Sequence, residues 1–148
     1  MKVAKDAFII DISDLTGQSP VPSVFFKKLI LRVLKKEKIR RATLSLLLVS
    51  DSFIRRLNKK FLARDRATDV LAFDLEDKEM PRHHLAGDIA VSLDTARATS
   101  RVFKISVEEE LCRYVVHGIL HLAGYDDRSS FKKRQMWKRQ EELLKETR

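Results

Sequence analysis

Two histidines four residues apart, His117 and His121, lie in an apolar run that ends at Gly124 and is followed by the carboxylates Asp126 and Asp127. Residues four apart on an α-helix share one face and lie about 6 Å apart along the axis, so both imidazoles can bind one ion. A glycine after the second histidine ends a helix in a left-handed turn, which can bring Asp127 back towards the imidazoles. We therefore predict a metal site formed by His117, His121 and Asp127. Zinc is the first choice, and other divalent transition metals are alternatives.

The same spacing occurs in zinc peptidases of the metzincin type, in which a glutamate follows the first histidine and acts as the general base. The corresponding residue here is Gly118, so a zinc-dependent peptidase is a minor alternative. Three protein ligands leave a fourth position for water or a phosphate oxygen, which makes hydrolysis the expected chemistry. Asp126 is a candidate catalytic residue that orients a ligand, with capping of the turn as an equal alternative.

The rest of the chain predicts the elements that position this motif. Apolar residues at helical spacing predict five helices, and alternating or β-branched runs predict four strands. The expected helices begin at about 19–23, 50, 92, 106 and 129, and the expected strands cover 7–13, 43–49, 70–75 and 86–92. The last two strands follow each other directly, which implies at least one antiparallel pair.

The helix that carries the motif is apolar on nearly every face from Leu111 to Leu122, so it must be central. We expect an α/β (α+β) fold, a three-layer-like sandwich with a central mixed four-stranded sheet and about five helices. The metal site lies at the end of the central helix. The length of 148 residues predicts a single domain over residues 1–148.

Several side chains outside the motif are predicted by the same patterns. Cys112 is expected to be an inert buried thiol. His83 and His84 lie in a charged linker, where exposure is favoured over ligation. The second helix is expected to carry its apolar residues on one side, namely Ile54, Leu57, Phe61 and Leu62. The last helix is expected to pack five apolar residues against the body, namely Phe131, Met136, Trp137, Leu143 and Leu144.

The charge of the chain favours a polyanionic partner. There are 30 Lys and Arg against 21 Asp and Glu, which gives a formal net charge of +9. Nucleic acid is the natural candidate, and a solvated basic surface is the alternative. The sequence contains no apolar run of about 18 residues, and charge follows the first methionine too closely for a secretion signal. We therefore expect a cytoplasmic protein without a membrane partner.

Three stretches between residues 57 and 127 carry a resemblance to a known family. Residues 117–126 match the signature H-G-x-L-H-L-x-G-Y-D-H position by position. Leu57-Asn58 with residues 68–73 is similar to L-N-x-x-[YF]-R…T-D-V-L-S-F, and residues 87–89 (Gly-Asp-Ile) give further support. The chain thereby resembles the YbeY endoribonucleases, also called ribosomal RNA maturation factors.

The resemblance implies a metal-dependent endoribonuclease that acts on single strands in ribosomal RNA maturation (16S rRNA processing) and in ribosome quality control. Its partners would be ribosomal RNA and the small ribosomal subunit. A non-catalytic ribosome assembly factor with a structural metal is the alternative. The family's third histidine falls on Asp127, which shifts the metal preference towards harder ions, and its arginine after the aromatic residue falls on Leu62.

The cation that is missing at Leu62 can be supplied by Arg64 or Arg66, which we take as candidate catalytic residues. Either guanidinium group would neutralise charge on the phosphoryl oxygens, and a solvated loop arginine is an equal alternative. Thr68 and Asp69 are expected to line the cleft or to close their loop. The residues expected to bind the RNA backbone are Lys59, Lys60, Arg64 and Arg66, together with the basic last helix.

Overall fold

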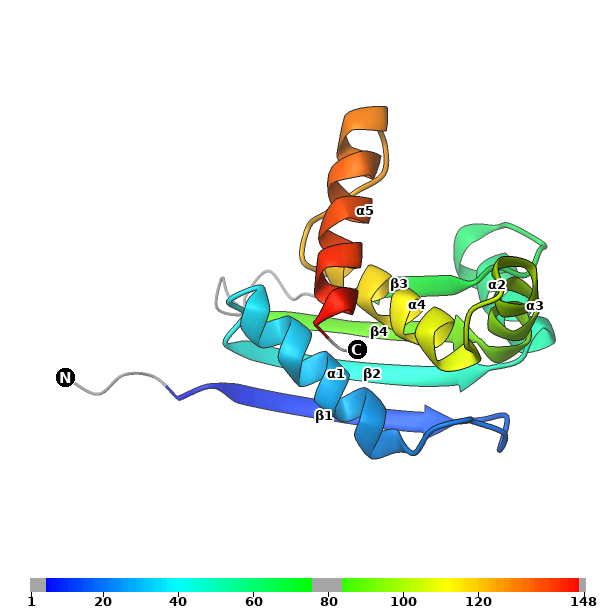
Figure 1. The fold of residues 1–148 in the computed structure, drawn as a ribbon, viewed down its shortest axis with the longest axis horizontal. Coiled ribbons are helices and arrows are strands. Elements are labelled where there is room, and N and C mark those ends of the chain that lie inside the picture. Colours follow the sequence, from blue (N-terminus) through cyan, green and yellow to red (C-terminus); the bar gives the residue numbers. More distant parts are fainter. Residues whose placement is uncertain (1–4, 76–83, 147–148) are drawn as a thin grey trace.

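The computed structural model describes residues 5–75 and 84–146, and over this part the prediction of four strands and five helices is confirmed. Figure 1 shows the arrangement of these elements. In chain order they are β1 (Ala7–Asp14), α1 (Ser23–Lys36), β2 (Arg41–Val49), α2 (Asp51–Leu62), β3 (Val70–Asp74), β4 (His84–Ser92), α3 (Leu93–Phe103), α4 (Val107–Leu122) and α5 (Ser130–Lys145).

The four strands form one mixed sheet in the order β1-β2-β4-β3. β1 pairs with β2 and β2 with β4 in parallel, whereas β3 pairs with β4 in the antiparallel sense. The expected antiparallel pair is thus β3 and β4, and the charged linker between them, including His83, lies outside the described residues. The predicted α/β class with a mixed sheet is confirmed.

Alternation along the strands assigns the helices to the two faces of the sheet. In β2, Leu44, Leu46 and Leu48 belong to the large core under α1 and α4, whereas Leu47 and Val49 pack with Ile54 of α2 on the opposite face. This second face is covered only towards β3 and β4, because Ile9 of β1 is 62% exposed. The third layer of the predicted sandwich is therefore a partial one.

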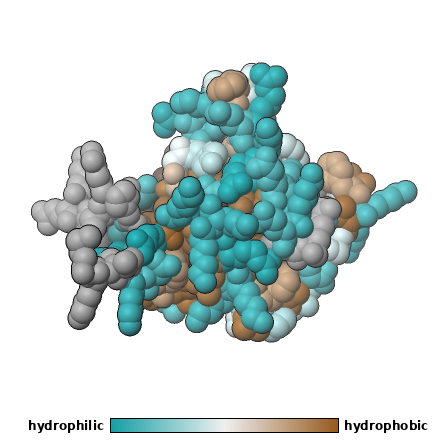
Figure 2. Space-filling model, turned by 60° about the vertical axis from the view of Figure 1, so that its left-hand side comes forward, coloured by the Kyte–Doolittle hydropathy of each residue, from teal (hydrophilic) through white to brown (hydrophobic). Residues whose placement is uncertain are grey.

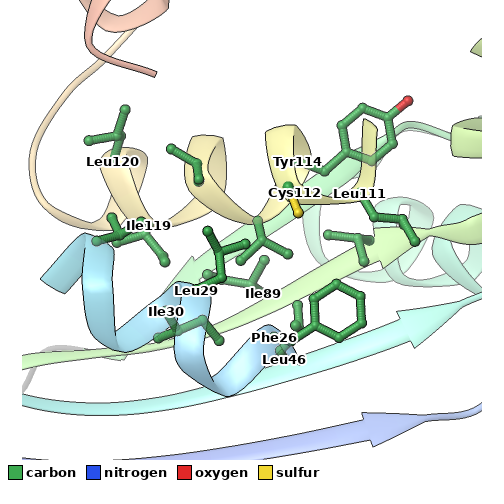
Figure 3. Packing of buried hydrophobic residues seen from close by; sticks show 14 of the residues in the cluster. Phe26, Leu29, Ile30, Leu46, Ile89, Leu111, Cys112, Tyr114, Ile119 and Leu120 are labelled. Carbon is green, nitrogen blue, oxygen red and sulfur yellow. The ribbon is translucent and has the colours of Figure 1, made fainter. Parts of the chain in front are cut away.

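Helix α4 is the central element, as its composition predicts. Figure 3 shows Cys112 and Ile119 pointing from α4 towards α1 and the sheet, and Tyr114 and Leu120 pointing the other way. All four side chains are buried. Gly118 allows this close packing, because a Cβ atom there would lie 2.8 Å from Cγ2 of Ile89 in β4.

Four apolar side chains of α2 and α5 are largely exposed, although the ring of Phe61 contacts that of Phe73 in β3 with centroids 5.4 Å apart. Phe61 is 56% and Leu62 48% exposed at the end of α2, and on α5 Phe131 is 64% and Trp137 56% exposed. The reason on α5 is its direction: its first turns rise away from the sheet, and only its C-terminal half reaches the body (Figure 1). Met136, Leu143 and Leu144 are buried as expected.

The interpretation of His84 as a linker residue is also wrong. His84 is the first residue of β4, is half-buried, and lies with Nε2 3.0 Å from Oγ1 of Thr43 on the neighbouring strand. Because charged residues precede His84 in the sequence, the apolar pattern does not reveal where the strand begins. Within residues 5–75 and 84–146, no helix is long and apolar enough to cross a membrane.

Candidate metal centre

The two motif histidines lie on the last two turns of α4. Ser106 caps the start of this helix by accepting a hydrogen bond from the Glu109 N–H at 3.1 Å. At the other end Gly124 has a φ of +106°, and its N–H donates to the carbonyl of His121. The left-handed turn predicted at Gly124 is therefore present.

A cavity of about 300 Å³ opens beside this end of α4. Both histidines line it, and so does Asp127, so the three predicted ligands lie on the wall of one cavity. The other predicted site residues on this cavity wall are Arg64, Arg66, Thr68 and Asp69. The cavity thus joins the end of α4 to the loop between α2 and β3, residues that are about 50 positions apart in the chain.

A hydrogen bond to α5 determines which nitrogen of His117 carries the proton. Nδ1 of His117 lies 2.9 Å from Oε1 of the buried Gln140, whose Nε2 donates to the carboxylate of Glu141 at 3.1 Å. Because the amide oxygen can only accept, the neutral imidazole has its proton on Nδ1 and its lone pair on Nε2. A metal-binding histidine has this tautomer and this kind of partner, so His117 fits a divalent transition metal.

The third ligand is not assembled in the same way. Among the described residues, no three His, Cys, Asp or Glu side chains are grouped closely enough to hold a metal ion. His121 and Asp127 are exposed on the cavity wall. The donor set present therefore fits a metal bound by two imidazoles, and the assignment of Asp127 as the third ligand stays a prediction.

Asp126 stands apart from the cavity wall. Its carboxylate accepts hydrogen bonds from the N–H of Arg128 at 3.1 Å and from Nζ of Lys132 at 3.4 Å. The bond from the Arg128 N–H, helped by Lys132, lowers the pKa of Asp126 below its usual value. These contacts are those of a turn cap, the alternative to a catalytic role.

The loop that carries Arg64 and Arg66 is fixed by Asn58 of α2. Asn58 is 2% exposed, and its Nδ2 donates to the carbonyl of Arg66 at 2.9 Å, while the Arg64 N–H donates to the carbonyl of Asn58. Neither guanidinium group forms an ion pair with a residue that the structure describes. Both arginines are therefore available to an anionic ligand in the cavity.

The neighbouring cations on α2 are placed differently. Lys59 and Lys60 occupy its last turn, and Nζ of Lys60 lies 5.3 Å from the ring centroid of Phe61. Neither lysine lines the cavity, so they can only extend its positive surroundings along α2. Leu62 does line it, at the position where the motif has arginine.

Thr68 and Asp69 fulfil both of the roles expected for them. They line the cavity, and Oδ1 of Asp69 accepts hydrogen bonds from the hydroxyl of Thr68 at 3.2 Å and from the N–H of Val70 at 2.8 Å. The carbonyl of Asp69 also accepts from the Ser92 N–H of β4. The loop is thereby tied to the sheet where β3 begins.

Two residues that position the site were not predicted. Gln140 lies in a basic helix and shows no periodicity of its own, so only its contact with His117 identifies it. Asn58 is part of a motif, yet its buried position and its bond to the Arg66 carbonyl depend on tertiary structure. Its Oδ1 has no hydrogen-bond partner among the described residues.

An α/β fold whose central helix places two histidines on one cavity wall with two arginines, neither of them in an ion pair within the described part of the chain, defines a hydrolase site suited to an anionic substrate. The chain belongs to the YbeY endoribonuclease family. The family model described as Endoribonuclease YbeY matches residues 12–148. The predicted endoribonuclease class and the resemblance of the motifs are thereby confirmed at the level of the family.

Individual relatives agree with this assignment. An Endoribonuclease YbeY of Treponema denticola is 38% identical over 84% of this chain and 83% of its own, and one of Persephonella marina is 32% identical over 89% and 88%. The solution structure of TM1509 from Thermotoga maritima is similar with a TM-score of 0.64 and 30% identity, over 94% of this chain and 89% of that chain.

Proposed function

We propose that this chain is a metal-dependent endoribonuclease that cleaves single-stranded ribosomal RNA during maturation of 16S rRNA and in ribosome quality control. The observation that carries the proposal is one cavity lined by His117, His121, Arg64 and Arg66 in a chain of net charge +9. The substrate and the small ribosomal subunit as partner follow from the family to which the chain belongs. Such work would take place in the cytoplasm.

His117 and His121 would hold the metal, zinc in the first instance, and Asp127 would be its third protein ligand because it lines the same cavity. A bound divalent ion supplies Lewis-acid polarisation of the phosphodiester. Gln140 holds His117 in the tautomer that presents the Nε2 lone pair. Its role is to position a ligand rather than to touch the substrate.

Arg64 and Arg66 would bind the scissile phosphate. Charge builds on the phosphoryl oxygens during hydrolysis, and guanidinium groups placed beforehand stabilise it without reorganisation. Asn58 keeps the loop in place through the Arg66 carbonyl. The peptidase alternative loses further support, because Gly118 packs against Ile89 so closely that an added Cβ atom would lie 2.8 Å from Cγ2 of Ile89.

The test replaces both histidines, His117→Ala and His121→Ala, and measures bound metal together with cleavage of a single-stranded segment of ribosomal RNA. We expect the wild type to bind one metal ion and cleave, and the double variant to lose both properties. His84→Ala is the matched control, because His84 bonds to Thr43 and does not line the cavity.

Three outcomes would count against the proposal. Undiminished cleavage by a metal-free double variant contradicts metal dependence. A wild type that binds metal tightly and associates with the small subunit without cleaving RNA favours the assembly factor with a structural metal. Loss of cleavage in His84→Ala places the activity outside the cavity.

A further inference from the structure

A second cavity, of about 430 Å³, adjoins the metal centre between α4, α5 and the start of β3. The two cavities share Asp69, Val70, His117 and Asp127 as wall residues. The volume lies within the range of roughly 300–1,000 Å³ that is typical of small-ligand sites. A ligand group bound here would lie directly beside a group bound at the histidines.

The interior of this cavity suits a flat, uncharged group. Its apolar walls are formed by Val70, Tyr114, Met136 and Trp137. Tyr114 and Met136 are 5% and 2% exposed, whereas the indole of Trp137 is 56% exposed. An aromatic ring held half in water beside a cavity is a surface on which another ring can stack.

The charges inside the cavity disfavour a phosphate there. Glu110 and Asp69 are wall residues. The guanidinium group of Arg113 is already bound by Glu110 at 3.0 Å and by Glu141 at 2.9 Å, so it is not free for an anion. An anionic group in the interior would therefore meet carboxylates and no available cation.

The rim of the cavity has the opposite character. Lys133 and Arg134 of α5 are exposed wall residues and form no ion pair with any residue that the structure describes. In the view of Figure 2, hydrophilic side chains dominate the upper part of the molecule, where α5 projects. Anionic groups can therefore be bound around the entrance while an uncharged ring lies inside.

We propose that this cavity binds an unstacked nucleobase of the RNA strand, the base next to the phosphate held at the metal centre. A nucleotide combines the two chemistries found here, because a flat uncharged base is linked covalently to an anionic phosphate. Single-stranded RNA binds proteins through stacking on aromatic side chains and through backbone cations. The inference rests on the proposed function, since the neighbouring cavity is taken to hold the phosphate.

Trp137 is the only tryptophan of the chain, so its fluorescence reports directly on this cavity. The probe is a 2′-O-methylated RNA octamer, which resists hydrolysis, compared with an abasic octamer that carries the same number of phosphates. We expect the octamer with bases to quench the fluorescence of Trp137 in a saturable way. The abasic octamer should bind at least fivefold more weakly and leave the fluorescence unchanged.

Variants are compared by the fluorescence anisotropy of a labelled octamer. Trp137→Ala should weaken binding roughly tenfold to a hundredfold, as expected for loss of one stacked base, and Trp137→Phe should restore part of the affinity. Phe131→Ala is the matched control, because Phe131 is an exposed aromatic residue of α5 outside the cavity. Its affinity should stay within twofold of the wild type.

Two results would overturn the inference. One is wild-type affinity in Trp137→Ala, and the other is quenching by an arginine or lysine ester but not by the octamer, which would identify a site for cationic side chains. Wild-type cleavage combined with unchanged affinity in Trp137→Ala rejects the base site and leaves the proposed function standing. Base-dependent quenching without cleavage supports the base site and rejects the proposed function.

Discussion

The hydrogen bond between His117 and Gln140 connects a buried residue of α5 to the chemistry of the cavity. Gln140 Oε1 accepts from Nδ1 at 2.9 Å, and the bond from Gln140 Nε2 to Glu141 keeps the amide from turning over. The same imidazole in the other tautomer would present an N–H to the cavity and bind no metal. A single amide thus controls which nitrogen of His117 has the lone pair that a metal would require.

Replacing this amide is expected to weaken metal binding without unfolding the protein. Gln140→Leu removes the acceptor and should lower the affinity for zinc about 10- to 100-fold, the usual effect of losing such a partner. Competition with a chelating dye measures the affinity independently of RNA cleavage. Gln135→Leu, an exposed position on the same helix, is the control, and an equal loss of affinity there would contradict the assigned role.

The close packing of Gly118 against Ile89 can be tested by a single substitution. An alanine in the middle of a helix normally stabilises it by about 1 kcal/mol relative to glycine. Here its Cβ would lie 2.8 Å from Cγ2 of Ile89, so Gly118→Ala should instead lower the free energy of unfolding by about 1–3 kcal/mol. Urea denaturation measures the change.

The effect of Gly118→Ala should depend on Ile89. In the double variant with Ile89→Ala the methyl group has room, so the combined loss should be smaller than the sum of the two single losses. Stabilisation by Gly118→Ala alone would show that the helix and the strand are not packed as closely as the structure has them.

At the scale of elements, hydrophobic periodicity was sufficient to predict each strand and helix and the central position of α4. It was not sufficient to predict the exposure of Phe61 or Trp137, because both lie on apolar stripes of ordinary helices and only the direction of the helix decides what covers them. His84 was misassigned because charges precede β4. Local patterns define elements, whereas their placement depends on contacts far apart in the chain.

The candidate site likewise contains residues that local sequence patterns reveal and residues that they do not. The spacing of His117, His121 and Gly124 is local to one helix and its end, so it was readable in the sequence. Gln140 and Asn58 act across elements, and nothing in their own neighbourhoods signals it. Arg64 and Arg66 were expected near the histidines only because the family's arginine falls on Leu62, and all four residues line one cavity because the loop before β3 lies beside α4.

The burial of α4 has a measurable consequence at high pH. Burial raises the pKa of the Cys112 thiol to about 11, from the value of 9.0 that it has when exposed. Between these values the unfolded chain loses the proton and the folded chain keeps it, so stability falls as the pH rises above 9. The loss should reach about 2 kcal/mol by pH 11, since one pKa unit corresponds to about 1.4 kcal/mol.

Denaturation at a series of pH values checks this, with Cys112→Ala as the reference that lacks the thiol. The difference in unfolding free energy between wild type and variant should be constant below pH 8 and change in favour of the variant above pH 9. A difference that is independent of pH would show that the thiol is accessible in the folded state, and rapid reaction with a thiol reagent at pH 8 would agree with that.

At the scale of the whole molecule, the charge of +9 is spread over several elements, and its distribution decides what binds where. Arg64 and Arg66 lie at the cavity, and Lys133 and Arg134 at the rim of its neighbour. Lys27 and Lys28 lie on the exposed face of α1 and line neither cavity. Equal changes in net charge at these places should therefore have unequal effects on RNA binding.

The salt dependence of RNA binding distinguishes cations that line the cavity from cations elsewhere on the surface. Each phosphate contact to single-stranded RNA contributes about 0.7 to the slope of log K against log salt concentration. The double variant Arg64→Gln with Arg66→Gln should thus reduce the slope by about 1.4, because two cations leave the strand's path. Lys27→Gln with Lys28→Gln removes the same charge and should leave the slope within about 0.3 of the wild type. Equal slopes for both variants would mean that RNA affinity depends on the net charge alone and that the strand is not bound at the cavity with the histidines.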